Sequence, residues 1–317
     1  MTVSRARRAS RSSLRSTFAS VVLLLLVARF GLLECRAENA RPPALAPPAP
    51  VESSSPRTVA PQPAPVGSSS PLRGSEATVS SSVHVALGTP RDGDPSDEFF
   101  IDQRAFVLSY SPEKRVPNWV AWQLDRGHLG HIGRQREFRP DLALPARFYR
   151  VKDSDYVRSG YDRGHLCPSA DRQDSTQSNA RTFLFTNIAP QLHELNSGPW
   201  EQLESWTRRR AKRGDVLYVV AGGVFSAPFS TIGNGVAVPV AHFKIIVVLK
   251  PGQGARDVNE RTEVLAALMP NQRGVGERAW TEYLTSVDAI ERASGYDFLS
   301  AVPERVQRVI EARTARP

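Results

Sequence analysis

The stretch YDRGH, residues 161–165, sets a histidine behind an arginine and a glycine in a predicted sharp turn. An imidazole held in this way can act as a general base near neutral pH, because its ordinary pKa lies close to the working range. Arg163 can bind a phosphate oxygen through its guanidinium group. Farther along the chain, Asn196 and Glu204 offer a hard cation an amide oxygen and a nearby carboxylate. The combination is typical of metal-assisted phosphodiester cleavage.

Three sequence blocks extend this pattern in a fixed order. They are DRGHL (162–166), TNIAPQ (186–191) and LN (195–196), the last followed by Trp200, Leu203, Glu204 and Arg208. Together the blocks resemble the DNA/RNA non-specific endonuclease family. The flanking segments WVAW (119–122) and GYDF (295–298) resemble it too, so the resemblance covers roughly residues 84 to 312.

The resemblance implies an α+β fold, in which a central, mostly antiparallel sheet with flanking helices carries a ββα-metal (His-Me finger) catalytic core. It also implies an enzyme, a Mg²⁺-dependent, sugar-non-specific endonuclease that hydrolyses DNA and RNA phosphodiester bonds and leaves 5′-phosphate products. Mn²⁺ is the alternative cofactor. DNA and RNA would bind through phosphate contacts, so the enzyme should read little sequence and lose affinity as salt rises.

Five side chains receive roles from the resemblance. His165 would take a proton from the attacking water, and Asn196 would ligate the metal through its side-chain oxygen. Glu204 would accept hydrogen bonds from metal-bound waters. Arg163 and Arg208 would clamp phosphate oxygens and stabilise the charge that develops at phosphorus. Four-residue steps along a predicted helix place Glu204 and Arg208 one turn apart, beside Asn196 at the helix start.

Two further residues complete the candidate site. Arg136 resembles a phosphate-facing arginine of the family, with Arg134 and Arg139 as rivals in the same segment. Asn187 either orients the histidine or shapes the turn between strands. Asp162 is expected to fix the turn that carries the histidine.

Two other functions fit the same residues. One is a secreted nucleic-acid-binding module that has lost catalysis, although the joint presence of His165, Asn196 and Glu204 argues against such a loss. The other is a phosphodiesterase with a narrower, smaller substrate. Other enzyme classes lack their motifs, because the chain has no Gly-x-Ser-x-Gly elbow and no Gly-x-x-x-x-Gly-Lys phosphate loop.

The chain is predicted to contain one catalytic domain behind two non-globular segments. Residues 1–37 have a signal-peptide layout, in which five arginines precede an apolar run. Residues 38–83 form a Pro/Ser-rich linker that we expect to be disordered, since ten of the 25 prolines lie between residues 41 and 72. Residues 84–317 remain as the endonuclease domain, long enough for a sizeable core.

The leader predicts export, so the mature protein would be secreted or periplasmic after cleavage near Ala37. Arg29 interrupts the apolar run and leaves it short of the roughly 20 residues of a membrane-spanning helix. A membrane anchor and an organelle transit peptide are the alternatives. The leader also carries most of the net charge: +9 for the whole chain minus +6 for residues 1–37 leaves +3. The global charge is therefore weak support for a nucleic-acid partner.

Apolar patterns predict the strands, and capping residues bound the main helix. Ser197 would cap a helix whose first turn contains Pro199 and which Gly214 would end. Cys167 would be the lone cysteine of the mature chain, in a buried apolar role. The predicted strands are 106–109, 119–124, 182–188, 216–220 and 240–249, and the other predicted helices are 279–285 and 304–313.

Overall fold

The computed structural model describes residues 79–315. The predicted leader and most of the predicted linker lie outside the described residues. Residues 79–83, which were expected to belong to the linker, are part of the fold, because the side chain of Val79 is fully buried in an apolar cluster. In residues 79–315, no helix is long and apolar enough to cross a membrane.

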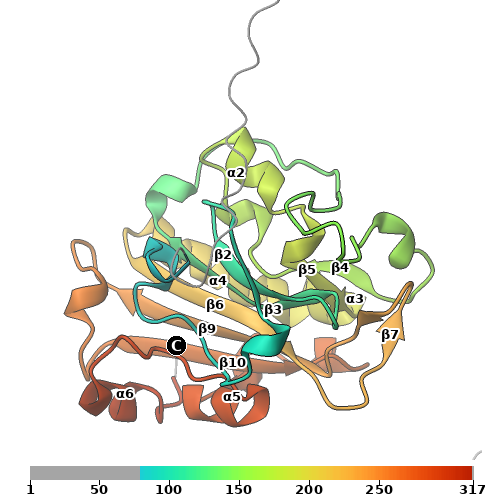
Figure 1. The fold of residues 1–317 in the computed structure, drawn as a ribbon. Coiled ribbons are helices and arrows are strands. Elements are labelled where there is room, and N and C mark those ends of the chain that lie inside the picture. Colours follow the sequence, from blue (N-terminus) through green and yellow to red (C-terminus); the bar gives the residue numbers. More distant parts are fainter. Residues whose placement is uncertain (1–78, 316–317) are drawn as a thin grey trace, which may run out of the picture. The chain divides into compact units, whose positions relative to one another are not determined.

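A seven-stranded sheet forms the centre of the domain (Figure 1). Its strand order is β1-β2-β3-β6-β9-β10-β11, and each neighbouring pair is antiparallel. The middle strands are long and rich in β-branched residues, which suit a sheet that is covered on both faces. The strands are β1 (Phe99–Asp102), β2 (Val107–Ser111), β3 (Val116–Leu124), β6 (Val216–Val224), β9 (Ala241–Leu249), β10 (Glu263–Pro270) and β11 (Leu284–Thr285).

Helices cover the two faces of this sheet in separate layers. Because successive side chains of a strand point to opposite faces, β9 sends Ile246 and Val248 into one apolar cluster and Ile245 and Val247 into the other. The first cluster packs against α4 (Glu201–Lys212), and the second against α5 (Val287–Ser294) and α6 (Glu304–Ile310). Figure 1 shows α5 and α6 below the sheet. This mixed architecture with a large antiparallel sheet confirms the predicted fold class.

A short hairpin beside α4 carries the DRGH motif. β4 (Asp162–His165) pairs antiparallel with β5 (Ile188–Gln191) in a sheet of its own. Gly164 lies against the buried side chain of Gln191, and a Cβ at this position would overlap that side chain. Glycine is therefore required by close packing at residue 164. The remaining α-helices and strands are α2 (Thr176–Arg181), α3 (His193–Leu195), β7 (Thr231–Ile232) and β8 (Val236–Ala237).

The main helix begins later than predicted and follows an irregular turn. α3 runs into a π-type turn, η7 (Asn196–Trp200), in which the backbone of Gly198 leaves helical geometry before α4 begins. Ser197 does not cap α4, because its hydroxyl donates to the backbone oxygen of His193 at 2.7 Å. Gly214 adopts a positive φ of 99° directly after the helix, as expected of a residue that ends one.

Three other predicted elements also differ from the structure. Residues 182–188 were predicted as a strand but contain a 3₁₀ turn, Phe185–Asn187, before β5 begins. Residues 279–285 were predicted as a helix but form a 3₁₀ turn and β11, because the helix-capping serine is Ser286, which accepts from the backbone N–H of Ala289 at the start of α5. The predicted terminal helix 304–313 is present as α6 but ends at Ile310.

Candidate active site

Five of the predicted site residues line one cleft of about 320 Å³: His165, Asn196, Glu204, Arg163 and Arg208. They come from β4, from η7 and from α4, so the hairpin forms one wall and the helix the other. The side chains of a short motif and of a downstream helix thus meet at one place, as the resemblance implied. Charged side chains line the cleft beside apolar surface, and the cleft is open to solvent, which suits a large charged substrate.

His165 is held rigidly at the end of β4. The indole Nε1 of Trp200 donates to its backbone oxygen at 3.2 Å, and the rings of Phe138 and Phe183 lie 5.3 and 4.9 Å from the imidazole, centroid to centroid. Nε2 is enclosed and has no hydrogen-bond partner, which leaves Nδ1 as the ring nitrogen available to the cleft. Burial, with Arg134 and Arg163 nearby, lowers the pKa of His165 to about 3. The imidazole is therefore neutral at pH 7 and able to accept a proton.

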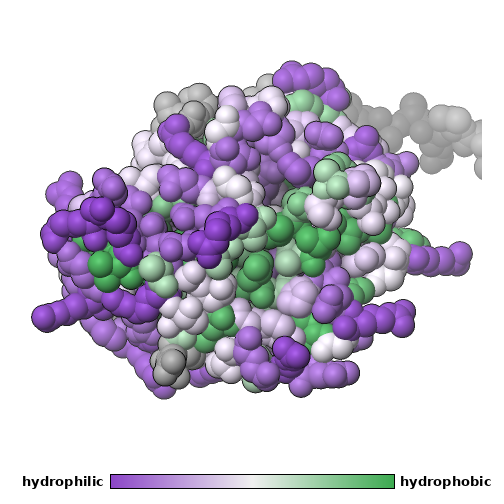
Figure 2. Space-filling view, turned by 90° about the horizontal axis from the view of Figure 1, so that it is seen from below, coloured by the Kyte–Doolittle hydropathy of each residue, from purple (hydrophilic) through white to green (hydrophobic). Residues whose placement is uncertain are grey.

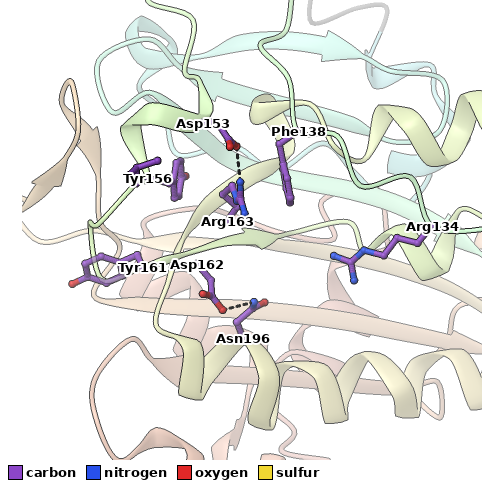
Figure 3. A pocket seen from close by; sticks show the side chains of 9 residues that line it. Arg134, Phe138, Asp153, Tyr156, Tyr161, Asp162, Arg163 and Asn196 are labelled. Atoms are coloured by element: carbon purple, nitrogen blue, oxygen red, sulfur yellow. Dashed lines mark hydrogen bonds and ion pairs between the residues drawn. The ribbon is translucent and has the colours of Figure 1, made fainter. Parts of the chain in front are cut away.

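The side-chain amide of Asn196 is oriented by a carboxylate. Its Nδ2 donates to Oδ2 of Asp162 at 2.9 Å (Figure 3). The Nδ1 of His193 lies 2.9 Å from the same oxygen. Because the nitrogen of the amide is engaged, the amide oxygen is left without a donor among the described residues. A neutral oxygen ligand fixed in a cleft with a carboxylate nearby fits a hard cation such as Mg²⁺. Asp162 thus does more than fix the turn, since it sets which end of Asn196 is offered to the cleft.

Glu204 lies on the floor of the cleft between two positively charged side chains, those of Lys244 and Arg208. Its Oε1 is 3.4 Å from the Nζ of Lys244, and its Oε2 is 3.6 Å from Nη1 of Arg208. Lys244 is fully buried on β9, with Nζ 3.9 Å from the ring centroid of Trp200. Burial raises the pKa of Glu204 and lowers that of Lys244, and the charge of each partner opposes the shift of the other. In this buried position, each of the two groups is stabilised in its ionised form by the charge of the other.

Arg208 is surrounded by acceptors that leave it pointing into the cleft. Its Nη1 lies 3.4 Å from Oδ1 of Asp171, and its Nη2 lies 3.5 Å from Oε1 of Glu201 and donates to the hydroxyl of Ser205 at 2.9 Å. Asp171 is itself buried and accepts from the indole N–H of Trp122 at 3.0 Å. The guanidinium is thereby preorganised, which lowers the entropy lost when it binds a phosphate oxygen.

Arg163 is anchored on the opposite wall (Figure 3). Its Nη1 lies 2.6 Å from Oδ1 of Asp153, and its guanidinium carbon is 4.5 Å from the ring centroid of Phe138. The side chain is about one third exposed, so it remains open to a ligand. Arg163 also lines an adjoining pocket of about 290 Å³ together with Tyr156 and Asp162. The hollow surface therefore continues past the cleft on this side.

In the segment before Phe138, the arginine that lines the cleft is Arg134, one of the two predicted rivals of Arg136. Arg136 is exposed and does not line the cleft, whereas Arg134 lines both the cleft and the adjoining pocket. Arg134 also acts electrostatically on His165 and lies over the ring of Phe183 at 5.6 Å. The rival residue Arg139 is in neither of these pockets, because its backbone pairs with Phe183 and Phe185. Arg134 is thus the arginine of this segment that faces the site.

Asn187 is also placed differently from a catalytic residue. Its side chain is fully buried, and it exchanges hydrogen bonds with the backbone N–H and C=O of Cys167 at 2.9 and 2.8 Å and donates to Thr182 O at 2.9 Å. These contacts hold the backbone that follows His165, and Asn187 does not line the cleft. Cys167 is buried as predicted, and burial raises the pKa of its thiol.

Comparison with known proteins decides the family. The model of the DNA/RNA non-specific endonuclease family matches residues 86–305. The chain belongs to this family. A nuclease of Nostoc sp. is 42% identical over 246 residues, which cover 75% of this chain and 88% of the relative. The mitochondrial endonuclease G of Homo sapiens is 32% identical, with 64% of this chain and 70% of the relative covered.

A solved structure agrees with the sequence relatives. The crystal structure of the EndoG/EndoGI complex has a chain that superposes with a TM-score of 0.60 and 26% identity, covering 70% of this chain and 94% of that one. As a member of the DNA/RNA non-specific endonuclease family, the chain is a nuclease. The family is metal-dependent in general, which agrees with the oxygen ligands that this cleft offers.

Lys244 is a buried neighbour of the candidate site that sequence patterns did not reveal. It stands inside the apolar run 240–249, and the next lysine, Lys250, comes directly after this run. A lysine within a central strand is a local inconsistency that requires a buried acidic partner. Glu204 supplies this partner, but the pairing of two residues forty positions apart depends on how α4 packs on the sheet.

The choice between Arg134 and Arg136 can be tested directly. We expect Arg134→Ala to slow cleavage of plasmid DNA by about 10- to 100-fold, because hydrogen bonds from a charged group are worth about 1.5–3 kcal/mol. The exposed Arg136→Ala is the matched control and should change the rate less than about threefold. Initial rates measured by gel at fixed salt decide the matter. An equal loss in both variants would mean that the segment contributes only net positive charge.

Proposed function

We propose that the chain is a Mg²⁺-dependent endonuclease that hydrolyses DNA and RNA without sugar specificity and leaves 5′-phosphate products, with His165 as the general base. Mn²⁺ is the alternative metal. One observation carries this proposal: the neutral imidazole of His165 and the oriented amide of Asn196 line the same cleft. A base and a cation ligand on a common phosphate-sized site are what metal-assisted phosphodiester hydrolysis requires.

Each side chain has a task that follows from its surroundings. Neutral His165 removes a proton from the water that attacks phosphorus. Arg134, Arg163 and Arg208 bind the non-bridging phosphate oxygens and stabilise the charge that builds up on them. Ionised Glu204 accepts hydrogen bonds from water molecules near Asn196. A divalent cation bound at Asn196 would supply Lewis-acid stabilisation of the leaving oxygen.

The same contacts explain the expected breadth of substrate. The cleft presents guanidinium groups, which bind phosphate, and the three arginines come from different elements, so they follow a backbone more readily than a base. Affinity should therefore fall as salt rises. Acceptance of both DNA and RNA rests on membership of the family. EndoG is bound to EndoGI in the related solved structure, so a protein inhibitor is a candidate partner of this chain as well.

Purified full-length chain incubated with supercoiled plasmid tests this function. We expect nicking and linearisation with Mg²⁺, none with chelator, and a strong loss in Asn196→Ala, while the exposed Asn259→Ala serves as the matched control. Plasmid that stays intact under all conditions would favour a nucleic-acid-binding module without catalysis. Faster turnover of a small diester than of long duplex would favour a narrower phosphodiesterase. End-labelling of the products reports whether the phosphate remains on the 5′ side.

For the location of the protein, we propose export through the N-terminal leader, with a secreted or periplasmic mature form. The second candidate is an organelle, because the relatives include mitochondrial nucleases such as human endonuclease G. A membrane anchor is the third. The N-terminal mass of the native protein separates these cases, since cleavage near Ala37 leaves a mature chain of defined length.

A further inference from the structure

A second group of oxygen ligands lies on the opposite face of the sheet from the cleft. Asp288 and Glu291 project from one side of α5, three residues apart, and Glu311 directly follows α6. Each offers a carboxylate oxygen, and the three oxygens lie within 4.8 Å of one another. The backbone N–H of Asp288 donates to the backbone oxygen of Glu311 at 3.2 Å, so the two helices meet at this point.

Glu311 is buried at this junction without a partner. Glu311 is only 7% exposed. Its Oε1 is enclosed and accepts no hydrogen bond from the described residues. Glu291 differs, because its Oε1 accepts from the backbone N–H of Phe298 at 3.0 Å. A buried carboxylate oxygen with no donor is costly, since neither water nor protein replaces its lost hydration. Some group must therefore satisfy it in the working protein.

The acidic groups around Glu311 further disfavour its ionised form. Burial, together with Glu291 and Asp288, raises its pKa to about 8, and Asp297 acts in the same direction. In the described part of the chain, the charged groups that act on Glu311 are all acidic. Arg292 is the basic residue that acts on Glu291, and its side chain is exposed to solvent. It affects the pKa of Glu291 less than burial and two neighbouring carboxylates do. Three carboxylates so close together can all be ionised only if a positive charge lies between them; without one, Glu311 would hold a proton.

We propose that Asp288, Glu291 and Glu311 bind a divalent cation, Ca²⁺ in preference to Mg²⁺. The three oxygens lie within 4.8 Å of one another, a separation that one Ca²⁺ can span, because two oxygens bound at about 2.3–2.6 Å from the ion lie at most about 4.6–5.2 Å apart. Mg²⁺ draws its ligands to about 2.1 Å and prefers to keep water. The carboxylates supply only oxygen, which excludes a preference for soft metals.

Such an ion would be structural and separate from catalysis. α5 and α6 already share an apolar cluster through Val287, Ile290, Val306 and Ile310, and the cation would join the rims of the two helices above it. This side of the molecule carries hydrophilic side chains over much of its surface, with hydrophobic ones gathered between them (Figure 2). Asp288 and Glu291 are partly exposed, so solvent reaches the edge of the site and water can complete the coordination sphere.

The test uses the full chain with Asn196→Ala, so that an ion in the cleft does not contribute. We expect calorimetry to show one Ca²⁺ bound per chain, and the melting temperature to rise by about 5–10 °C at about 100 times the dissociation constant. Glu311→Gln should abolish both effects, and Glu291→Gln, whose side chain is more exposed, should weaken them. Glu304→Gln, at the exposed start of α6, is the matched control and should bind Ca²⁺ as the parent does.

Three results would overturn the proposal. The first is a melting temperature that does not respond to Ca²⁺, and the second is the same response in Glu311→Gln as in Glu304→Gln. The third is a protein that gains stability only on acidification, which would assign the buried oxygen of Glu311 to a proton. None of these results bears on plasmid cleavage, so the fate of this site and that of the proposed function are measured apart.

Discussion

Replacing His165 by alanine should reduce the rate of plasmid cleavage by about 10²- to 10⁴-fold, the range expected when a general base is removed. The ring lies at the end of β4 with Nδ1 available to the cleft, and burial keeps it neutral at pH 7. Substrate binding should change little, because the three arginines of the cleft remain. Steady-state kinetics should therefore show the loss in kcat and leave KM nearly constant.

His131 provides the control for this experiment. It is exposed and outside the cleft, so His131→Ala should keep the parent rate. Circular dichroism and binding of uncleaved DNA establish that His165→Ala is folded. If this folded variant retained more than about one tenth of the parent rate, the proton would have to be taken by another group.

The lowered pKa of His165 sets the expected dependence on pH. Because the folded-state pKa of about 3 lies below the ordinary 6.5, the acid limb of kcat/KM should fall well below pH 6.5. The same shift makes stability depend on pH: the contribution of neutral His165 is fully present above pH 6.5 and is lost as the pH falls toward 3.

Replacing Lys244 by methionine should lower the free energy of unfolding by about 3–5 kcal/mol at pH 7, which is the usual effect of removing one partner of a buried ion pair. The Nζ of Lys244 lies 3.4 Å from Glu204, and both side chains are almost without exposed surface. Methionine has a similar length, so the main change is that the Glu204 carboxylate keeps only Arg208, at 3.6 Å, as a cationic partner. Urea denaturation at several pH values measures the effect.

The pH dependence of this variant has a definite sign. Burial raises the pKa of Glu204 already in the parent, and the loss of Lys244 raises it further. A carboxyl group with a raised folded-state pKa favours folding below its ordinary pKa of 4.5 and disfavours it as the pH rises through the folded-state value. The deficit of Lys244→Met should therefore be smallest in acid and largest at neutral pH.

Two further variants isolate the ion pair. Ile246→Met changes the next residue on the same face of β9 and should cost less than about 1.5 kcal/mol, as shape-conserving core changes do. The double variant Lys244→Met with Glu204→Gln should regain most of the lost stability without regaining activity. Equal stability of Lys244→Met and Ile246→Met would show that the pair does not hold Glu204 in place.

Much of the sheet could be predicted because its strands carry their own signals. The runs 216–220 and 240–249 are continuous and apolar, and both form central strands, β6 and β9. The hairpin of β4 and β5 gave no such signal, since DRGH and IAPQ have neither apolar alternation nor length. Their extended shape depends on tertiary contacts. These are the packing of Gly164 on Gln191 and the hydrogen bond from the indole of Trp200 to the backbone oxygen of His165.

The site was predictable where it follows sequence blocks and unpredictable where it depends on packing. His165, Asn196 and Glu204 belong to blocks in a fixed order, and the structure brings them to one cleft. Arg134 and Arg136 lie in an irregular segment without periodicity, so nothing in their spacing tells which of them turns inward. Asn187 stands in a matching block as well, yet its neighbours in space are backbone groups.

The alternation of β9 has a consequence for anyone who redesigns this enzyme. Lys244 lies under α4, and its neighbour Ile245 lies in the apolar cluster that packs against α5 and α6. A deletion or insertion of one residue in β9 would exchange them, placing an ammonium group among aliphatic side chains and a methyl group opposite Glu204. Length changes in the loops at either end of β9 should be tolerated far better than a one-residue shift in the register of this strand.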